Sequence, residues 1–126
     1  MNIQAKLLRG VDGNYLIMVV SGLVHINGVQ RVLNRVIDAS RQLLDCKVLL
    51  DFQDCTFRVL SSEFTSLGKE FDFSEWPHNN TVVLVSTTSI EQCQQLALLK
   101  EALASNRIRV AAFPDTKEAI NWLSNA

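Results

Sequence analysis

The sequence predicts a single α/β domain whose elements follow the order β-β-α-β-α-β-α-β-α. Short apolar runs of strand length alternate with longer stretches of helical periodicity, and this alternation requires crossover connections between parallel strands. Only a glycine-containing turn separates the first two strands, so we expect them to form an antiparallel hairpin on a mostly parallel sheet. The chain has 126 residues, 48% of them hydrophobic, which is long enough to bury a core, and residues 1–126 are expected to form one domain.

Composition and charge narrow the classes of function. The net charge of −1 gives no global positive field that would favour nucleic acid. No apolar run approaches the ~20 residues that a membrane-spanning helix needs, and the polar alternation of the first ten residues is unlike a secretory signal. Cys46, Cys55 and Cys93 show neither C-x-x-C spacing nor a nearby histidine pair. They therefore predict reduced thiols in a cytoplasmic protein, with no disulfide or zinc site.

The predicted hairpin occupies the first twenty residues. Asn2–Leu8 alternates polar and apolar residues with a period of two, which indicates a half-exposed strand at a sheet edge. An edge strand also offers a surface for a homodimer, although Lys6 and the polar alternation oppose such pairing. After a turn at residues 10–14, Tyr15–Val20 is a continuous apolar run, typical of a strand covered on both faces. The chain is expected to leave the sheet at Ser21-Gly22.

The next segment has the clearest helical pattern in the sequence. Asn27 is expected to cap this helix, with Gln30 reaching back to complete a capping box. One face is apolar and carries Val29, Val32, Leu33, Val36, Ile37, Leu43 and Leu44. The opposite face is polar and carries Arg31, Asn34, Arg35, Asp38 and Arg41.

The segment from Lys47 to Phe71 is the predicted centre of the fold. Val48–Phe52 is a buried strand that ends in a polar corner with Asp51 and Asp54, and a serine pair then opens a helix. The apolar face of that helix consists of Phe64, Leu67 and Phe71. A break follows at residues 72–80, which contain Pro77 and two asparagines.

The last third of the chain predicts two further strand–helix units. Thr81–Ser86 and Arg107–Phe113 are the strands, the second stopped by Pro114. Thr88-Ser89-Ile90-Glu91 fits a capping box, and its helix places Cys93, Leu96, Ala97, Leu99, Ala102 and Leu103 inside before ending at Ser105-Asn106. Asp115 and Glu118 cap the final helix, which places Ala119, Ile120 and Leu123 inside.

No set of residues predicts catalysis, a metal site or a cofactor site. His25 and His78 lie far apart in the sequence and have no spaced carboxylate or cysteine partners. The glycines form neither a dinucleotide fingerprint nor a phosphate-binding loop. Asp51 and Asp54 stand where α/β proteins often bind Mg²⁺, but Met18–Ser21 contributes no further acid. We expect a protein that is not an enzyme.

Ser61 and Ser62 lie at the predicted start of a helix, where free backbone N–H groups and the positive end of the helix dipole favour an anion. A phosphate on either serine would be stabilised there. The simpler interpretation is that one serine is the N-cap of the helix. We favour the N-cap because Glu63, on the same turn, would repel a phosphate.

The region around this helix also predicts a surface for a protein partner. Phe73 and Trp76 follow the helix in a loop and are candidates for an exposed apolar patch. Six acids stand against two bases between Asp51 and Glu75, and a solvated helix face is the common explanation of such a bias. An acidic rim around aromatic residues would instead suit a basic protein. The predicted partner surface consists of Glu63, Glu70, Phe73, Glu75 and Trp76.

Three short motifs resemble the STAS pattern of bacterial anti-sigma factor antagonists. Val48–Phe52, Cys55-Thr56-Phe57 and Ser61-Ser62 are similar to its buried strand, its apolar residue and its serine corner. Val20-Ser21-Gly22-Leu23 is similar to the exit from its second strand, and the element order agrees along nearly the whole chain. The resemblance is closest to the divergent SpoIIAA-like, STAS/SEC14-like branch. Val59-Leu60 replaces the aspartate that precedes the serines in the family, and Glu63 replaces its glycine.

The resemblance implies a non-enzymatic regulatory domain that binds a protein partner through its second helix and the following loop. In the family a kinase/anti-sigma protein phosphorylates the serine at this corner, which here would be Ser61 or Ser62. The SEC14-like likeness implies an alternative, a carrier of a small apolar ligand or lipid. An enzyme is the least favoured hypothesis.

Overall fold

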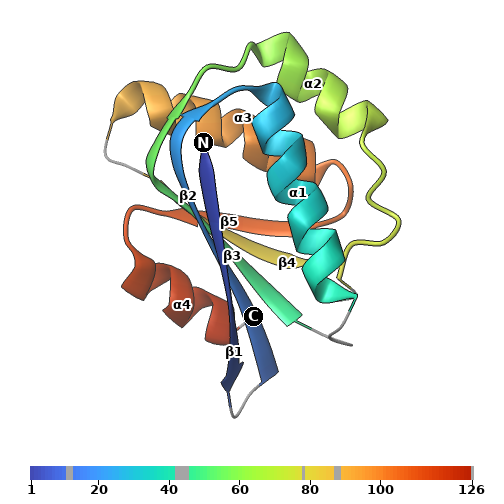
Figure 1. Cartoon of the computed structure of the whole chain (residues 1–126), viewed down its shortest axis with the longest axis vertical. Coiled ribbons are helices and arrows are strands. Elements are labelled where there is room, and N and C mark those ends of the chain that lie inside the picture. The colour runs from blue at the N-terminus through green and yellow to red at the C-terminus, as the bar shows by residue number, and fades with distance from the viewer. Residues whose placement is uncertain (11–12, 42–45, 78, 87–88, 126) are drawn as a thin grey trace.

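The computed structural model describes residues 1–10, 13–41, 46–77, 79–86 and 89–125 (Figure 1). Its elements are β1 (Asn2–Gly10), β2 (Gly13–Val24), α1 (Ile26–Ser40), β3 (Cys46–Phe57), α2 (Ser61–Glu70), β4 (Thr81–Val85), α3 (Ile90–Ala104), β5 (Arg109–Phe113) and α4 (Thr116–Ser124). The strands form one sheet in the order β1-β2-β3-β4-β5. The β1–β2 pair is antiparallel and the other pairs are parallel. The predicted fold class and element order are confirmed.

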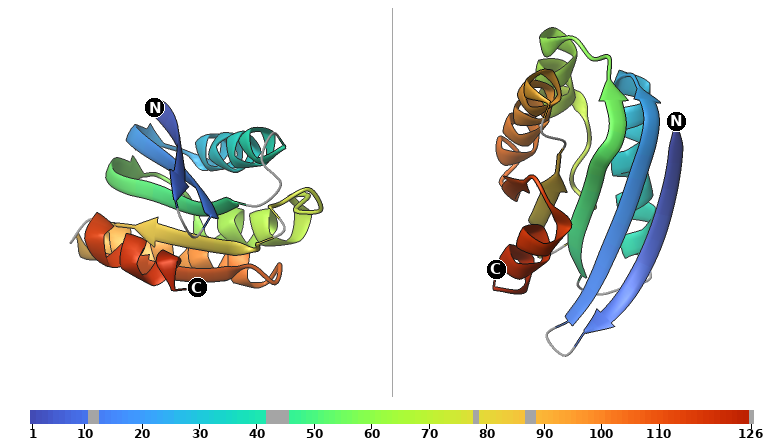
Figure 2. Two further views of the ribbon diagram at one scale, coloured as in Figure 1. Left: turned by 90° about the horizontal axis from the view of Figure 1, so that it is seen from below. Right: turned by 90° about the vertical axis from the view of Figure 1, so that its left-hand side faces the viewer.

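The helices divide unequally between the two faces of the sheet. The larger core contains buried residues of α1, α2 and α3, whereas buried residues of α4 belong to a separate, smaller core. Figure 1 shows α1, α2 and α3 grouped together and α4 apart from them, and the left-hand view of Figure 2 shows α1 and α4 on opposite sides of the strands. Successive side chains of β3 point to opposite faces of the sheet. Val48 and Leu50 therefore belong to the larger core, and Leu49 belongs to the smaller one.

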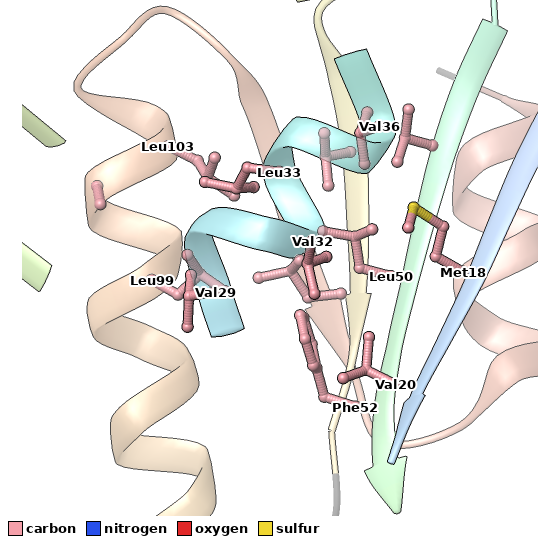
Figure 3. Packing of buried hydrophobic residues seen from close by; sticks show 14 of the residues in the cluster. Met18, Val20, Val29, Val32, Leu33, Val36, Leu50, Phe52, Leu99 and Leu103 are labelled. Atoms are coloured by element: carbon pink, nitrogen blue, oxygen red, sulfur yellow. The ribbon is translucent and has the colours of Figure 1, made fainter. Parts of the chain in front are cut away.

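The apolar face of α1 packs onto the sheet as its periodicity predicts. Figure 3 shows its valines and Leu33 against Met18 and Val20 of β2, Leu50 and Phe52 of β3, and α3. The polar residues expected on the opposite face are exposed. The predicted apolar residues Leu43 and Leu44 lie outside the described residues.

Strands β2 and β3 are longer than predicted. The pairing of β2 with β3 continues beyond the end of β4 as far as Val24 and Phe57, with an irregularity between Val19 and Ser21. The expectations that the chain leaves the sheet at Ser21-Gly22, and that Asp51 and Asp54 end a strand, are therefore wrong. Gly22 allows the strand to continue, because its φ of +90° strains any residue with a side chain.

The run Tyr15–Val20 is completely covered on only one face. Leu16, Met18 and Val20 are completely buried, whereas Tyr15, Ile17 and Val19, which alternate with them, are partly exposed. This difference follows from the position of α4, whose sheet contacts lie mainly on β3, β4 and β5, so that Tyr15 and Ile17 are only partly covered where they pack against the smaller core. As predicted, β1 is an edge strand, but Ile3 alone of its residues is partly buried. No helix in the described ranges has the length and apolar character to cross a membrane.

Three of the predicted helix starts differ from the structure. His25, not Asn27, is at the N-cap of α1, and Leu60, not a serine, is at the N-cap of α2. Ser89 precedes α3 without a side-chain capping bond, and Thr88 lies outside the described residues. The predicted cap of α4 is confirmed, because Asp115 Oδ1 accepts a hydrogen bond from Glu118 N–H at 2.8 Å. Cys93, Ala97 and Ile120, expected inside their helices, are exposed.

Candidate functional site

The two serines occupy the first turn of α2, and both are exposed. The capping bond at this helix start comes from Glu63, whose Oε1 accepts the Leu60 N–H at 2.9 Å. A carboxylate near a helix N-terminus also interacts favourably with the helix dipole. The prediction that a serine caps the helix is therefore wrong, and neither hydroxyl is needed to start it.

A groove of about 580 Å³ lies between α1 and α2 and includes one of these serines. It is lined by Ile26, Gln30 and Asn34 from α1, by Ser62, Glu63, Ser66, Leu67 and Glu70 from α2, and by Phe71 and Asp72 after it. We call this the acidic groove, because its lining contains three acids and no base. Ser62 lies on the groove, whereas Ser61 is not part of its lining.

Hydrogen bonds from Ser74 stabilise the ionised form of Asp72, one of the three acids that line the acidic groove. Ser74 N–H donates to Asp72 Oδ1 at 2.9 Å. Hydrogen bonds from the Ser74 side chain and then from its backbone lower the pKa of Asp72 below its ordinary value. Asp72 is therefore ionised at neutral pH and contributes a full negative charge to the groove.

The aromatic residues predicted to form an exposed patch are instead part of the core. Trp76 is only 5% exposed, and Phe73 is partly buried against the larger core. Their rings form a series with Phe71, with centroids 4.7 Å apart from Phe71 to Phe73 and 5.7 Å apart from Phe73 to Trp76. The backbone N–H of Trp76 donates to the backbone carbonyl of Phe73 in a turn that folds the loop back on itself. The predicted exposed patch is wrong because this turn buries the indole.

Glu75 is tied to α1 by an ion pair. Arg41 donates from Nε at 3.0 Å and from Nη2 at 2.7 Å to Glu75 Oε2, and Asp38 lies 3.3 Å from Arg41 Nη1. All three side chains are exposed, so the pair contributes little to stability. It does hold the loop after α2 against the end of α1.

The structure therefore divides the predicted partner surface. It brings Glu63 and Glu70 together on the acidic groove, but it places Phe73 and Trp76 inward and Glu75 beside Arg41. The wall contributed by α1 was not predicted as part of a site. A signal for it exists, since Gln30 and Asn34 are four residues apart and share one side of the helix.

The acids of β3 do not form a chemical site with the nearby thiol. Asp51 Oδ1 accepts the Gln53 N–H, and Cys55 Sγ donates to Phe52 O at 3.2 Å. Burial, and then the charges of Asp51 and Asp54, raise the pKa of the Cys55 thiol to about 12. This thiol is a poor nucleophile. Among the described residues no group of three or more histidine, cysteine or acidic side chains could hold a metal, and His78 lies outside them.

The raised pKa of Cys55 predicts a loss of stability in alkali. Above pH 9 the thiol ionises in the unfolded chain but stays protonated in the fold until about pH 12, so folding becomes less favourable as the pH rises. The contribution falls by at most ~1.4 kcal/mol per pH unit, and by less where water reaches the thiol. Urea denaturation between pH 8 and pH 10.5 should show a steeper loss in the wild type than in Cys55→Ala. Parallel pH profiles would contradict the prediction.

A second groove, of about 350 Å³, lies on the opposite face between the β1–β2 hairpin and α4. It is lined by Leu8, Arg9, Gly10, Tyr15, Ile17, Leu49, Ile120, Leu123 and Ser124. We call this the hairpin groove. Its walls are mostly apolar, and it lies where α4, which packs mainly on β3 to β5, only partly covers the hairpin.

Comparisons with known proteins identify the fold. Neither the known family models nor the curated proteins include a match to this chain. Among solved structures, an uncharacterized protein of the DUF3478 family with a SpoIIAA-like fold, from Shewanella loihica PV-4, is similar with a TM-score of 0.58. The match covers 96% of this chain and 93% of that chain at 14% sequence identity. The chain therefore has a SpoIIAA-like, STAS-like fold, as its motifs predicted.

Proposed function

We propose that residues 1–126 form one cytoplasmic STAS-like domain, without enzymatic activity, that regulates a protein partner by binding it in the acidic groove. The observation that carries this proposal is the composition of the groove. Glu63, Glu70 and Asp72 supply negative charge without a base among the lining residues, next to an exposed serine at a helix start. The fold supports an interaction domain but does not by itself identify the partner.

The groove favours a partner segment that is basic and partly apolar. Ile26, Leu67 and Phe71 give its lining an apolar component beneath the acids. A Lys- or Arg-containing segment would pair its charges with the acids and place its apolar side chains against this floor. Such complementarity increases the association rate and excludes acidic partners.

Charge reversal in the groove tests this proposal. Purified wild-type protein and the double variant Glu70→Lys/Asp72→Lys are used as baits in lysate of the native cell, and retained proteins are quantified by mass spectrometry. We expect at least one partner to be retained about tenfold less by the variant, because like charges then oppose the contact. Glu101→Lys, an exposed reversal on α3, should retain the partner. Equal retention by the wild type and the groove variant would exclude the acidic groove as the docking surface.

Within this proposal Ser62 is the regulatory serine. It lines the groove, whereas Ser61 does not. A phosphate there would add about −1.5 to −2 charges beside Glu63 and so change the affinity of the groove for a charged partner. We expect protein isolated from its native cell to carry one phosphate that is lost in Ser62→Ala and retained in Ser61→Ala, measured by intact mass and peptide mapping. A phosphate that maps to Ser61, or no phosphate under any growth condition, would contradict the assignment.

The hairpin groove favours a second candidate function, a carrier of a small apolar ligand. Leu8 and Ile120 are 38% and 40% exposed on facing walls of this groove, and an apolar occupant would cover both. The volume of the hairpin groove lies at the lower end of the ~300–1,000 Å³ typical of small-molecule sites.

A further inference from the structure

The hairpin groove combines apolar walls with basic groups at the end nearest the hairpin turn. Strand register places Leu8 opposite Tyr15, and Tyr15 opposite Lys47, in one row across three strands. Ile17 and Leu49 form the next row on the same face. Because Arg9 follows Leu8 and also lines the groove, two bases lie at this end.

Lys47 is the unusual group at this end. It is only 9% exposed, and its Nζ donates to Leu123 O at 2.9 Å and lies 5.9 Å from the centroid of the Tyr15 ring. An ammonium has three donors, and within the described ranges the only acids in ion pairs are those beside Arg41. Lys47 therefore places a buried ammonium beside Leu123 and Tyr15, two residues that line the hairpin groove.

Arg9 is the base among the residues that line the groove. It is exposed, it lines the groove directly, and the described residues place no acid in an ion pair with it. Tyr15 and Leu123, which line the groove, are the same residues that Lys47 contacts. An anionic head group beside Arg9 would thus also lie near the Lys47 ammonium, and the field of both charges favours a carboxylate over a neutral or cationic group.

We propose that the hairpin groove binds a single-chain alkyl carboxylate of medium length. The alkyl chain lies against Leu8, Ile17 and Ile120, and the carboxylate lies beside Arg9 with Lys47 behind it. The groove volume of about 350 Å³ favours one alkyl chain over a two-chain phospholipid. This inference rests on the second candidate function, the carrier of an apolar ligand, and it specifies the ligand class and the site.

Calorimetry and native mass spectrometry with three probes test this proposal. The probes are dodecanoate and dodecylammonium below their critical micelle concentrations, and dodecanol below its solubility limit. We expect one dodecanoate per chain, bound at least about tenfold more tightly than dodecanol, and weaker binding still of the ammonium. The exposed-site variant Arg9→Gln should lose about tenfold in dodecanoate affinity without a change in dodecanol affinity. Lys47→Met, which removes the charge and keeps an unbranched side chain one atom shorter, should behave in the same way.

Two further variants separate the groove from non-specific binding. Ile120→Asp places an acid on the groove wall and should abolish binding of dodecanoate and weaken that of dodecanol. Ile90→Asp makes the same exchange at a side chain that is 76% exposed on α3, and should leave binding unchanged. Circular dichroism of each variant verifies that it is folded.

The outcomes distinguish the carboxylate ligand class from the carrier function on which it rests. Equal affinities for dodecanoate and dodecanol, with loss of both in Ile120→Asp, would overturn the carboxylate inference and leave the carrier function intact. Failure of all probes to bind would overturn both. Binding of dodecanoate that is unaffected by Ile120→Asp, Arg9→Gln and Lys47→Met would overturn the assignment to this groove.

Discussion

Replacing Trp76 by alanine is expected to destabilise the domain by about 3–5 kcal/mol, the usual cost of removing a buried aromatic side chain. The indole is 5% exposed and packs with the Phe71 and Phe73 rings in the larger core. Its removal leaves a cavity beneath the loop that Glu75 ties to α1. Urea unfolding followed by far-UV circular dichroism measures the change directly.

Two control substitutions show whether the loss of stability in Trp76→Ala comes from removing the buried ring. Trp76→Phe should cost far less than Trp76→Ala, because the buried Nε1 has no hydrogen-bond partner in the described part of the chain and its loss relieves an unsatisfied donor. Leu60→Ala, at a side chain that is 68% exposed, should change stability by less than ~0.5 kcal/mol. If Trp76→Ala were as stable as the wild type, the indole would belong to the surface, as its position in a loop suggested.

Replacing Phe52 by alanine is expected to cost a similar ~3–5 kcal/mol. Phe52 is 2% exposed, lies among the side chains beneath α1 in Figure 3, and has its ring centroid 5.1 Å from that of Phe57. Phe57 in turn lies 6.5 Å from Phe64 of α2. The substitution therefore removes the first ring of a series that joins β3 to α2.

The comparison residue for Phe52 is on the same strand. Thr56 is exposed on β3, and Thr56→Ala should cost well under 1 kcal/mol, within the range of surface substitutions. Chemical denaturation of both variants under the same conditions gives the difference. A loss below ~1 kcal/mol for Phe52→Ala would contradict the packing at the start of this series.

The sequence predicts the elements well because their burial is periodic. The apolar face of α1 packs on the sheet, so spacing alone identifies Val29, Val32 and Val36 as core. The extension of β3 could also have been predicted, because the apolar residues Cys55 and Phe57 are buried and Thr56 between them is exposed. The polar side chains of Gln53 and Asp54 concealed this strand pattern, since they resemble a turn.

The candidate site was less predictable because it depends on tertiary contacts. Glu63 and Glu70 could be assigned to one surface from their helix alone, but the opposite wall of the acidic groove comes from α1, which precedes them by more than twenty residues. Trp76 follows a helix and a short loop, and no local pattern indicates that the loop turns inward. The hairpin groove likewise depends on where α4 lies across the sheet.

The separation of the two cores has a spectroscopic consequence. The chain contains two tryptophans, and they lie on opposite faces of the sheet, Trp76 in the larger core and Trp122 packed against the smaller one. Trp76 adjoins the Phe71 ring series that borders the acidic groove, and Trp122 precedes Leu123 on the wall of the hairpin groove. In the variants Trp76→Phe and Trp122→Phe, the intrinsic fluorescence of the remaining indole therefore reports on one groove at a time, without any attached dye.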